Sequence, residues 1–202
     1  MRIMLVRHGE TQWNLENRIV GHTEIGLNPT GQRQVALLAR ALGEEKVDAI
    51  YSSPLRRAVE TANAIAKEHG LDVVTDDALK EVDAGELDGI AIEEVVRRYG
   101  DFWEAWGKGA DTLRMPGGET MGELQHRAWS VTNRVVGDHP DSTVIVVSHT
   151  LTILSILTKA LGMPLEDFRR LRLGLASINT LDFKGSVTSL VGFNDTCHLM
   201  DM

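Results

Sequence analysis

The segment "RIMLVRHGETQWN", residues 2–14, places a buried strand directly before a cationic pair. Ile3 to Val6 form an unbroken apolar run, which is typical of a strand covered on both faces of a parallel sheet. Arg7, His8 and Gly9 follow where that strand should end. A cationic pair at such a position is either a solvated strand end or part of a site for an anionic ligand.

Further apolar runs predict the other strands of the same sheet. Two are rich in β-branched residues and read as buried parallel strands, and two near the end of the chain form a pair joined by a turn at Lys184-Gly185. These runs are "VDAIYS" at 47–52, "TVIVVS" at 143–148, "SINTLDF" at 177–183 and "SVTSLVGF" at 186–193.

Segments with helical period lie between these strands. We expect a helix capped by Thr30 and ending before Gly43, and another opened by Ser53-Pro54 and closed by Gly70. A third begins near Thr120, and a fourth starts after His149. Alternation of strands and helices predicts βαβ units, and therefore a three-layer α/β/α fold with a mainly parallel sheet and helices on both faces.

We expect residues 1–202 to form a single domain. The segment 76–117 differs from the rest because it has short polar and apolar pieces, Gly-rich punctuation and two tryptophans, Trp103 and Trp106. It is predicted to be an excursion from the sheet that forms part of a pocket wall. The two tryptophans are expected to pack within it.

Composition excludes several classes of partner. The chain has 202 residues with 21 basic and 29 acidic side chains, a formal net charge of −8, which argues against a nucleic-acid or anionic-membrane surface. The single cysteine, Cys197, excludes an internal disulfide and fits a reducing compartment. No apolar stretch approaches the roughly 20 residues that span a bilayer, so we expect a cytoplasmic protein. An exposed edge strand or the 76–117 excursion would allow a homodimer.

Chemistry-bearing side chains follow three of the predicted strands. Arg7 and His8 follow the first, Arg56-Arg57 the second, and His149 the third, where the N-terminus of a helix begins at Thr150. Ligands of open α/β sheets bind at the carboxyl ends of the strands. Guanidinium groups and helix N-termini suit phosphate oxygens, and a neutral imidazole can attack phosphorus. The set predicts a site for a phosphoryl group, with His8 as nucleophile and His149, if cationic, stabilising oxygen charge.

Cleavage of a phosphate ester also needs a proton for the leaving alkoxide. The segment "LKEVDAGELDG" at 79–89 offers four carboxyl groups where the chain leaves the sheet. Glu81 is the best placed, but its residue pattern does not separate it from the others, Asp83, Glu86 and Asp88.

Seven blocks in order resemble the histidine phosphatase (phosphoglycerate mutase-like) superfamily. They are "LVRHGETQWN" at 5–14, "NRIVGHTEIGLNPTGQRQ" at 17–34, "YSSPLRRAVETA" at 51–62, "LKEVDAGELDG" at 79–89, "PGGET" at 116–120, "VIVVSHT" at 144–150 and "NDTCHL" at 194–199.

The resemblance implies His8 as the phosphorylated nucleophile and Glu81 as the proton donor. It places Arg7, Arg57 and His149 around the phosphate, with Asn14 and Thr150 as further phosphate contacts. Glycine commonly stands where this chain has Thr150, so a methyl and a hydroxyl are added at the pocket edge. Gly21, His22 and Thr23 are possible substrate contacts. No metal or other cofactor is implied.

Three functions remain open within that resemblance. The first is a metal-independent phosphomonoesterase acting on a small phosphorylated metabolite. The second is a cofactor-dependent phosphoglycerate mutase, which would use 2,3-bisphosphoglycerate; such mutases are typically longer, and an arginine and a tyrosine closely follow their proton donor. Here Val82, Asp83 and Ala84 follow Glu81, which favours the phosphatase. The third is a regulatory protein that binds phosphate esters without turnover.

Overall fold

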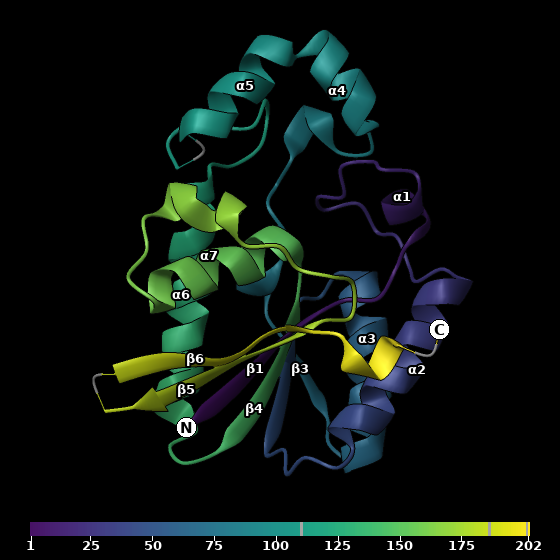
Figure 1. The fold of residues 1–202 in the computed structure, drawn as a ribbon, viewed down its shortest axis with the longest axis vertical. Helices are drawn as coiled ribbons and strands as arrows, with labels where there is room; N and C mark the ends of the chain where they lie inside the picture. Colours follow the sequence, from purple (N-terminus) through teal and green to yellow (C-terminus); the bar gives the residue numbers. More distant parts are fainter. Residues whose placement is uncertain (110, 186, 201) are drawn as a thin grey trace.

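The computed structural model describes residues 1–109, 111–185, 187–200 and 202. Ser186, the predicted first residue of the last strand, and Ala110, within the predicted excursion, lie outside the described residues. A mixed sheet runs through the molecule in the strand order β3-β2-β4-β1-β5-β6 (Figure 1). Its strands are β1 (Arg2–Arg7), β2 (Ala49–Ser52), β3 (Val73–Thr75), β4 (Thr143–Ser148), β5 (Ile178–Lys184) and β6 (Val187–Asp195).

Strands β1 to β4 are mutually parallel where they pair, and β5 and β6 form an antiparallel hairpin against β1. The expectation of a mainly parallel sheet in an α/β fold is therefore confirmed. Strand β3 was not predicted, because its three residues are too few for a periodic signal.

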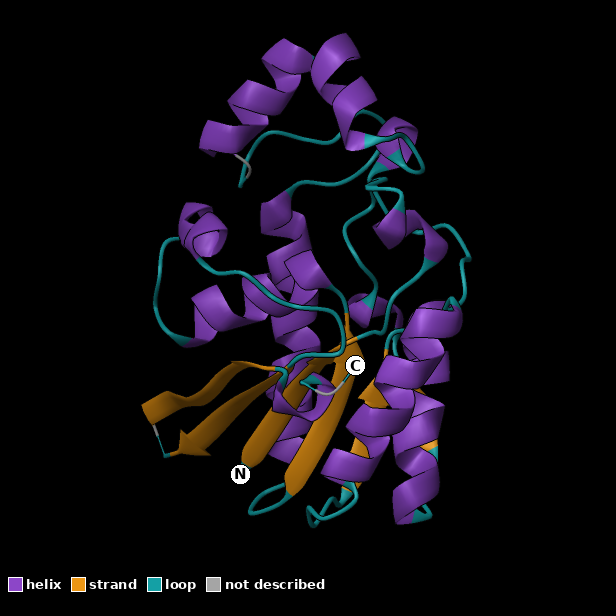
Figure 2. Cartoon of the chain, turned by 45° about the vertical axis from the view of Figure 1, so that its right-hand side comes forward, coloured by secondary structure: helices purple, strands orange, loops and turns teal. Residues whose placement is uncertain are grey.

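The alternation of side chains in β1 explains why the sheet is covered on both faces. Ile3 and Leu5 belong to the core cluster that includes residues of α6 (Met121–Asp138) and α7 (Thr150–Ala160). Met4 and Val6 point the other way, into the cluster built from α2 (Pro29–Leu42) and α3 (Arg56–His69). Figure 2 shows these helices on opposite sides of the strands. A continuous apolar run thus fills two cores at once.

Two helix starts differ from the predictions. Asn28, not Thr30, caps α2: its side chain accepts a hydrogen bond from the Gly31 backbone, and Pro29 occupies the first turn, where a missing N–H costs nothing. Helix α3 begins at Arg56, two residues after Pro54, and its N-cap residue, Leu55, makes no side-chain hydrogen bond to it. Thr120 caps α6 as expected, in a reciprocal capping box with Glu123.

The segment after β3 rises beyond the carboxyl ends of the parallel strands and carries α4 (Ile92–Arg98) and α5 (Gly100–Gly109) at the top of Figure 1. It also contains the short 3₁₀ helices η1 (Asp77–Leu79) and η2 (Gly85–Leu87). The remaining elements are α1 (Gln12–Leu15), η3 (Leu165–Arg170) and η4 (Cys197–Leu199).

Strand β6 forms one edge of the sheet and exposes Val187, Val191 and Phe193. Pairing of two copies along an edge stays a prediction, for which the oligomeric state in solution is the measurement. Within the part of the chain that the structure describes, no helix is both long and apolar enough to cross a membrane.

Candidate active site

His8 stands at the carboxyl end of β1 and is 3% exposed. Its Nδ1 lies 2.7 Å from the Gly9 carbonyl oxygen, and because a carbonyl only accepts, Nδ1 carries the hydrogen. Burial, followed by the charges of Arg57 and Arg7, holds the pKa of His8 well below its usual value. The imidazole is therefore neutral, with a lone pair on Nε2. This is the tautomer that a nucleophilic histidine needs.

The turn that follows His8 is held against the start of α2. A side chain at Gly31 would collide with the backbone carbonyl of Glu10, so only glycine allows this approach. A few residues on, Thr11 and Asn14 form a capping box at α1, in which the Asn14 amide oxygen accepts from Thr11. The remaining polar group of Asn14 is its amide NH₂, a donor suited to an anion.

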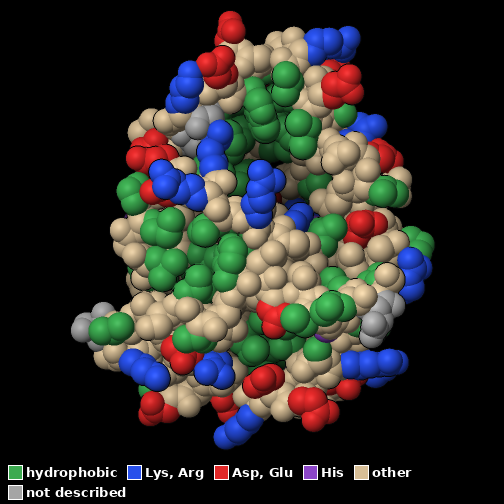
Figure 3. All heavy atoms as spheres, in the orientation of Figure 1, with side chains coloured by type: hydrophobic (Ala, Val, Ile, Leu, Met, Phe, Trp, Pro, Cys, Tyr) green, Lys and Arg blue, Asp and Glu red, His purple; other side chains and the backbone are tan. Residues whose placement is uncertain are grey.

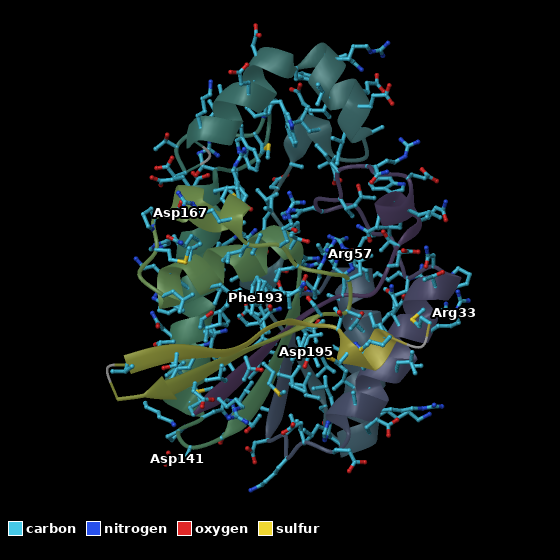
Figure 4. The ribbon with its side chains drawn as sticks, in the orientation of Figure 1. Arg33, Arg57, Asp141, Asp167, Phe193 and Asp195 are labelled. Carbon is cyan, nitrogen blue, oxygen red and sulfur yellow. The ribbon has the colours of Figure 1, made fainter. Side chains whose placement is uncertain are left out.

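Two arginines lie beside His8, of which Arg57 is buried and Arg7 is half-buried. Arg7 donates from Nη1 to the Leu173 carbonyl at 2.7 Å, and its Nε is buried without a partner among the described residues. Arg57 is fully buried at the centre of the molecule (Figure 4). Burial lowers the pKa of each guanidinium to about 10, opposed by the charge of Glu81, so both remain cationic at neutral pH. The site is a concentration of buried positive charge.

His149 directly follows β4 and is hydrogen-bonded to Arg57. Its Nδ1 accepts a hydrogen bond from Arg57 Nε at 3.2 Å, so the ring hydrogen is on Nε2, which donates to Ser53 Oγ at 2.8 Å. Its ring centroid lies 5.1 Å from that of His8. Burial, then the charges of Arg57 and other neighbours, holds the pKa of His149 well below its usual value. His149 is thus neutral here. Its hydrogen bonds with Arg57 and Ser53 do not require a cationic imidazole.

Glu81 is the carboxyl group that reaches this site. Its side chain is buried and accepts from the backbone N–H groups of Val82, Leu151 and Thr152 at 2.9, 3.1 and 3.2 Å. The N-terminus of α7, which we expected to receive phosphate, is therefore occupied by Glu81 in this structure. Thr150 lines the cavity in the first turn of α7, for which His149 is the N-cap.

The other acidic residues of 79–89 have different positions. Asp83 accepts from the Gly85 backbone, and Glu86 is exposed. Asp88 accepts from the backbone N–H groups of Gly21 and Thr23 and so fixes that loop. Tertiary structure thus separates four carboxyl groups that the sequence leaves equivalent.

The loop of Gly21, His22 and Thr23 is hydrogen-bonded to Arg57 and to the backbone of Glu81. The carbonyls of Gly21 and Thr23 accept from Arg57 Nη2 and Nη1 at 2.8 and 3.1 Å, and His22 Nε2 donates to the Glu81 carbonyl at 2.8 Å. None of the three lines the cavity described below. In this structure they support Arg57 and Glu81, and contact with a substrate stays a prediction.

A cavity of about 530 Å³ opens over His8. At one end it is polar, with Arg7, His8, Asn14, Glu81 and Thr150. At the other end, under α4 and α5, it is walled by apolar side chains, among them Trp103 and Trp106, which we expected to be packing residues only. Figure 3 shows hydrophobic side chains gathered along the upper part of this hollow, with Lys and Arg side chains near it. Arg57 and His149 are buried and do not line it.

Sequence reasoning missed two supporting residues. Ser53, which the sequence places at the end of the second strand and at the start of a helix but with no assigned role, is fully buried and accepts the His149 hydrogen bond. Arg127, in the middle of α6, donates to the carbonyls of Ala78, Lys80 and Glu81, each at 2.8 Å, and pairs with Glu119 at 2.5 Å. No sequence signal marks Arg127, because three of its four partners are backbone carbonyls distant in the chain.

Replacing Arg127 with methionine is expected to lower kcat about 10- to 100-fold with little change in KM, because the backbone that carries Glu81 loses its anchor. Steady-state kinetics on an alkyl phosphate measures this. Arg134→Met provides a matched control, since Arg134 lies on the same helix but is half-exposed and pairs with Asp76. An unchanged kcat in a folded Arg127→Met protein would contradict the positioning role.

Inorganic phosphate is expected to stabilise the fold, because it neutralises buried cations that otherwise face one carboxylate. At a concentration 100 times its Kd the gain is about 2.7 kcal/mol, or about 5–10 °C in Tm for a chain of this size. The measurement is Tm in phosphate against chloride at equal ionic strength. Arg57→Met should lose most of this shift and keep only the general salt effect; an equal shift in both proteins would show that phosphate acts elsewhere.

Comparison with known proteins places this geometry in a family. The model of the histidine phosphatase superfamily (branch 1) matches residues 3–196. Phosphoserine phosphatase 1 of Hydrogenobacter thermophilus is 33% identical, with 98% of this chain and 94% of that protein covered. A probable phosphoglycerate mutase GpmB of Proteus mirabilis is 34% identical, with 100% and 96% covered.

Solved structures agree with this placement. Phosphoserine phosphatase from Entamoeba histolytica, a mutant in complex with phosphoserine, superposes with a TM-score of 0.90 at 29% identity and covers 98% of this chain and 99% of that chain. A mycobacterial glucosyl-3-phosphoglycerate phosphatase in complex with VO3 superposes with a TM-score of 0.89 at 28% identity, covering 96% and 98%.

The chain therefore belongs to the histidine phosphatase superfamily (branch 1). Within that family it is a phosphatase that hydrolyses small phosphate esters.

Proposed function

We propose that this phosphatase works without a metal ion, in two steps, through a phosphohistidine on His8. In the first step His8 Nε2 attacks phosphorus, the ester P–O bond breaks, and Glu81 gives its proton to the leaving alkoxide. In the second step water attacks the phosphohistidine and Glu81 takes up the water proton. Phosphate then leaves, so His8 is again neutral and Glu81 is again protonated.

The observation that carries this proposal is the bare Nε2 of a neutral His8 that has the cations Arg7 and Arg57 as neighbours. Cations in a low-dielectric site stabilise the equatorial oxygens most when negative charge gathers on them. Arg7 and Asn14 reach the cavity directly, while Arg57 holds His149 next to His8. A histidine nucleophile with this electrostatic surrounding does not need a metal to activate it.

The mutase alternative has support from the GpmB relatives. The residues after Glu81 favour hydrolysis, because Val82 presents an apolar side chain to the cavity where a phosphoglycerate carboxylate would need a cation. We also propose that the protein acts in the cytoplasm on a small phosphorylated metabolite, since a single cysteine fits a reducing compartment.

Two assays on the wild-type protein in EDTA test the proposal. The first follows phosphate release from a panel of aryl and alkyl phosphate monoesters. The second follows conversion of 3-phosphoglycerate to 2-phosphoglycerate in the presence of 2,3-bisphosphoglycerate. Multiple turnovers of release without isomerisation are expected. Isomerisation without release would replace the phosphatase by a mutase, and activity that vanishes in EDTA and returns with a divalent cation would overturn metal independence.

A further inference from the structure

Part of the cavity wall has a composition that the phosphoryl chemistry does not explain. It is formed mainly by Val82, Ile92, Trp103, Trp106, Met115 and Leu151, and we call this part the apolar chamber. Trp103 and Trp106 stack with ring centroids 5.6 Å apart and planes at 21°, so they present an aromatic wall. Both belong to α5, which lies at the top of Figure 1.

The chamber is placed to receive the alcohol part of a substrate. An ester whose phosphoryl group lies against His8 and Arg7 has its leaving oxygen near Glu81, and Val82 and Leu151 follow directly on Glu81 and Thr150. A cavity of about 530 Å³ is much larger than a phosphoryl group requires. The room beyond the reacting atoms is therefore available to the alcohol.

Few of the described side chains that line the cavity are charged. Among the described residues that line the cavity, the one carboxylate is Glu81, which already accepts three backbone hydrogen bonds. A substrate ammonium group would have no other anionic partner there. Among the described lining residues, the cation besides Arg7 is Arg18, which donates to Glu16 at 2.6 Å and to the Gly89 carbonyl at 2.9 Å. A zwitterionic alcohol such as serine would lose water without finding a matched site.

We propose that the preferred substrates are phosphate monoesters whose alcohol carries an aromatic or branched apolar group, held by the apolar chamber. This rests on the phosphatase activity proposed above and adds the substrate class. Burial of such a group removes apolar surface from water at no cost in unpaired polar atoms.

The test compares alkyl phosphates, so that the leaving alcohols have similar basicity and differ in shape and charge. The probes are 2-phenylethyl phosphate, phosphoserine, 3-phosphoglycerate and glycerol 3-phosphate. We expect kcat/KM for 2-phenylethyl phosphate to exceed that of each other ester by about tenfold or more. Trp103→Ala should reduce this ratio, whereas Trp129→Ala, a half-buried tryptophan of α6 outside the chamber, should leave it unchanged.

The outcomes separate this inference from the proposed function. Hydrolysis of all four esters at similar rates, or a ratio unchanged by Trp103→Ala, would overturn the chamber and leave the phosphatase intact. A preference for phosphoserine or 3-phosphoglycerate that Arg18→Gln abolishes would show that the rim selects an acid instead. Hydrolysis of none of the four esters or of an aryl phosphate would remove the phosphatase proposal as well.

Discussion

Replacing His8 with alanine is expected to lower phosphate release by about 10⁴-fold or more, because the reaction loses the atom to which the phosphoryl group is transferred. The measurement is kcat for an aryl phosphate in EDTA, together with protein quenched in alkaline denaturant from a reaction in progress. Wild type should carry an acid-labile, base-stable phosphoryl group, and His8→Ala should carry none. The loss should be similar for aryl and alkyl esters, since every ester must pass through the same intermediate.

Two controls separate lost chemistry from lost structure. His126→Ala removes an exposed histidine of α6 and should retain wild-type turnover. His8→Ala itself should still be stabilised by phosphate, because Arg7 and Arg57 remain in place and cationic. A phosphoryl group found on a residue other than His8, or turnover retained in His8→Ala, would exclude His8 as the nucleophile.

Replacing Glu81 with glutamine is expected to have the second largest effect, and its size should depend on the leaving group. For alkyl phosphates the loss should be about 10²- to 10⁴-fold, because an alkoxide of high basicity cannot leave without a proton. For p-nitrophenyl phosphate, whose phenolate leaves unprotonated, the first step should be nearly unaffected. Pre-steady-state release of nitrophenol measures that step alone.

The second step gives a further signature of the same change. Without Glu81 as base, hydrolysis of the phosphohistidine should slow, so Glu81→Gln should show a nitrophenol burst followed by slow turnover. Glu86→Gln is the matched control, because Glu86 is an exposed carboxyl group five residues away on the same segment. An equal loss of the first step for aryl and alkyl esters would show that Glu81 holds the N-terminus of α7 and does not transfer a proton.

The order of strands and helices was predictable because it depends on local patterns. Apolar runs of four to six residues define β1, β2 and β4, and helical periods of two turns or more define α2, α3, α6 and α7. The antiparallel hairpin of β5 and β6 was equally visible from its turn at Lys184-Gly185. Short elements were not predictable: β3 has three residues, and capping by Asn28 instead of Thr30 depends on one hydrogen bond to Gly31.

Residue periodicity did not separate Arg56 from Arg57, and the family resemblance was needed to choose. In the structure the two adjacent side chains point apart, as neighbouring positions of a helix must. Arg56 has 66% of its side chain exposed and pairs with Glu60, whereas Arg57 is fully buried against His149. Burial on this helix is set by which face meets the sheet, so it is a tertiary property.

The sequence by itself determined the α/β class and the gathering of Arg7, His8, Arg57 and His149, because parallel strands bring their carboxyl ends to one edge. The residue pattern left the carboxyl group open, and the family resemblance was needed to choose Glu81. Tertiary structure alone decided how Glu81 is held at that edge, how His8 and His149 are protonated, and that Trp103 and Trp106 wall the cavity. The physical reason is distance along the chain. The strand-end cluster follows from local pattern and topology, whereas Glu81 is placed by Arg127 and α7, and the tryptophans by the excursion that folds back over the sheet.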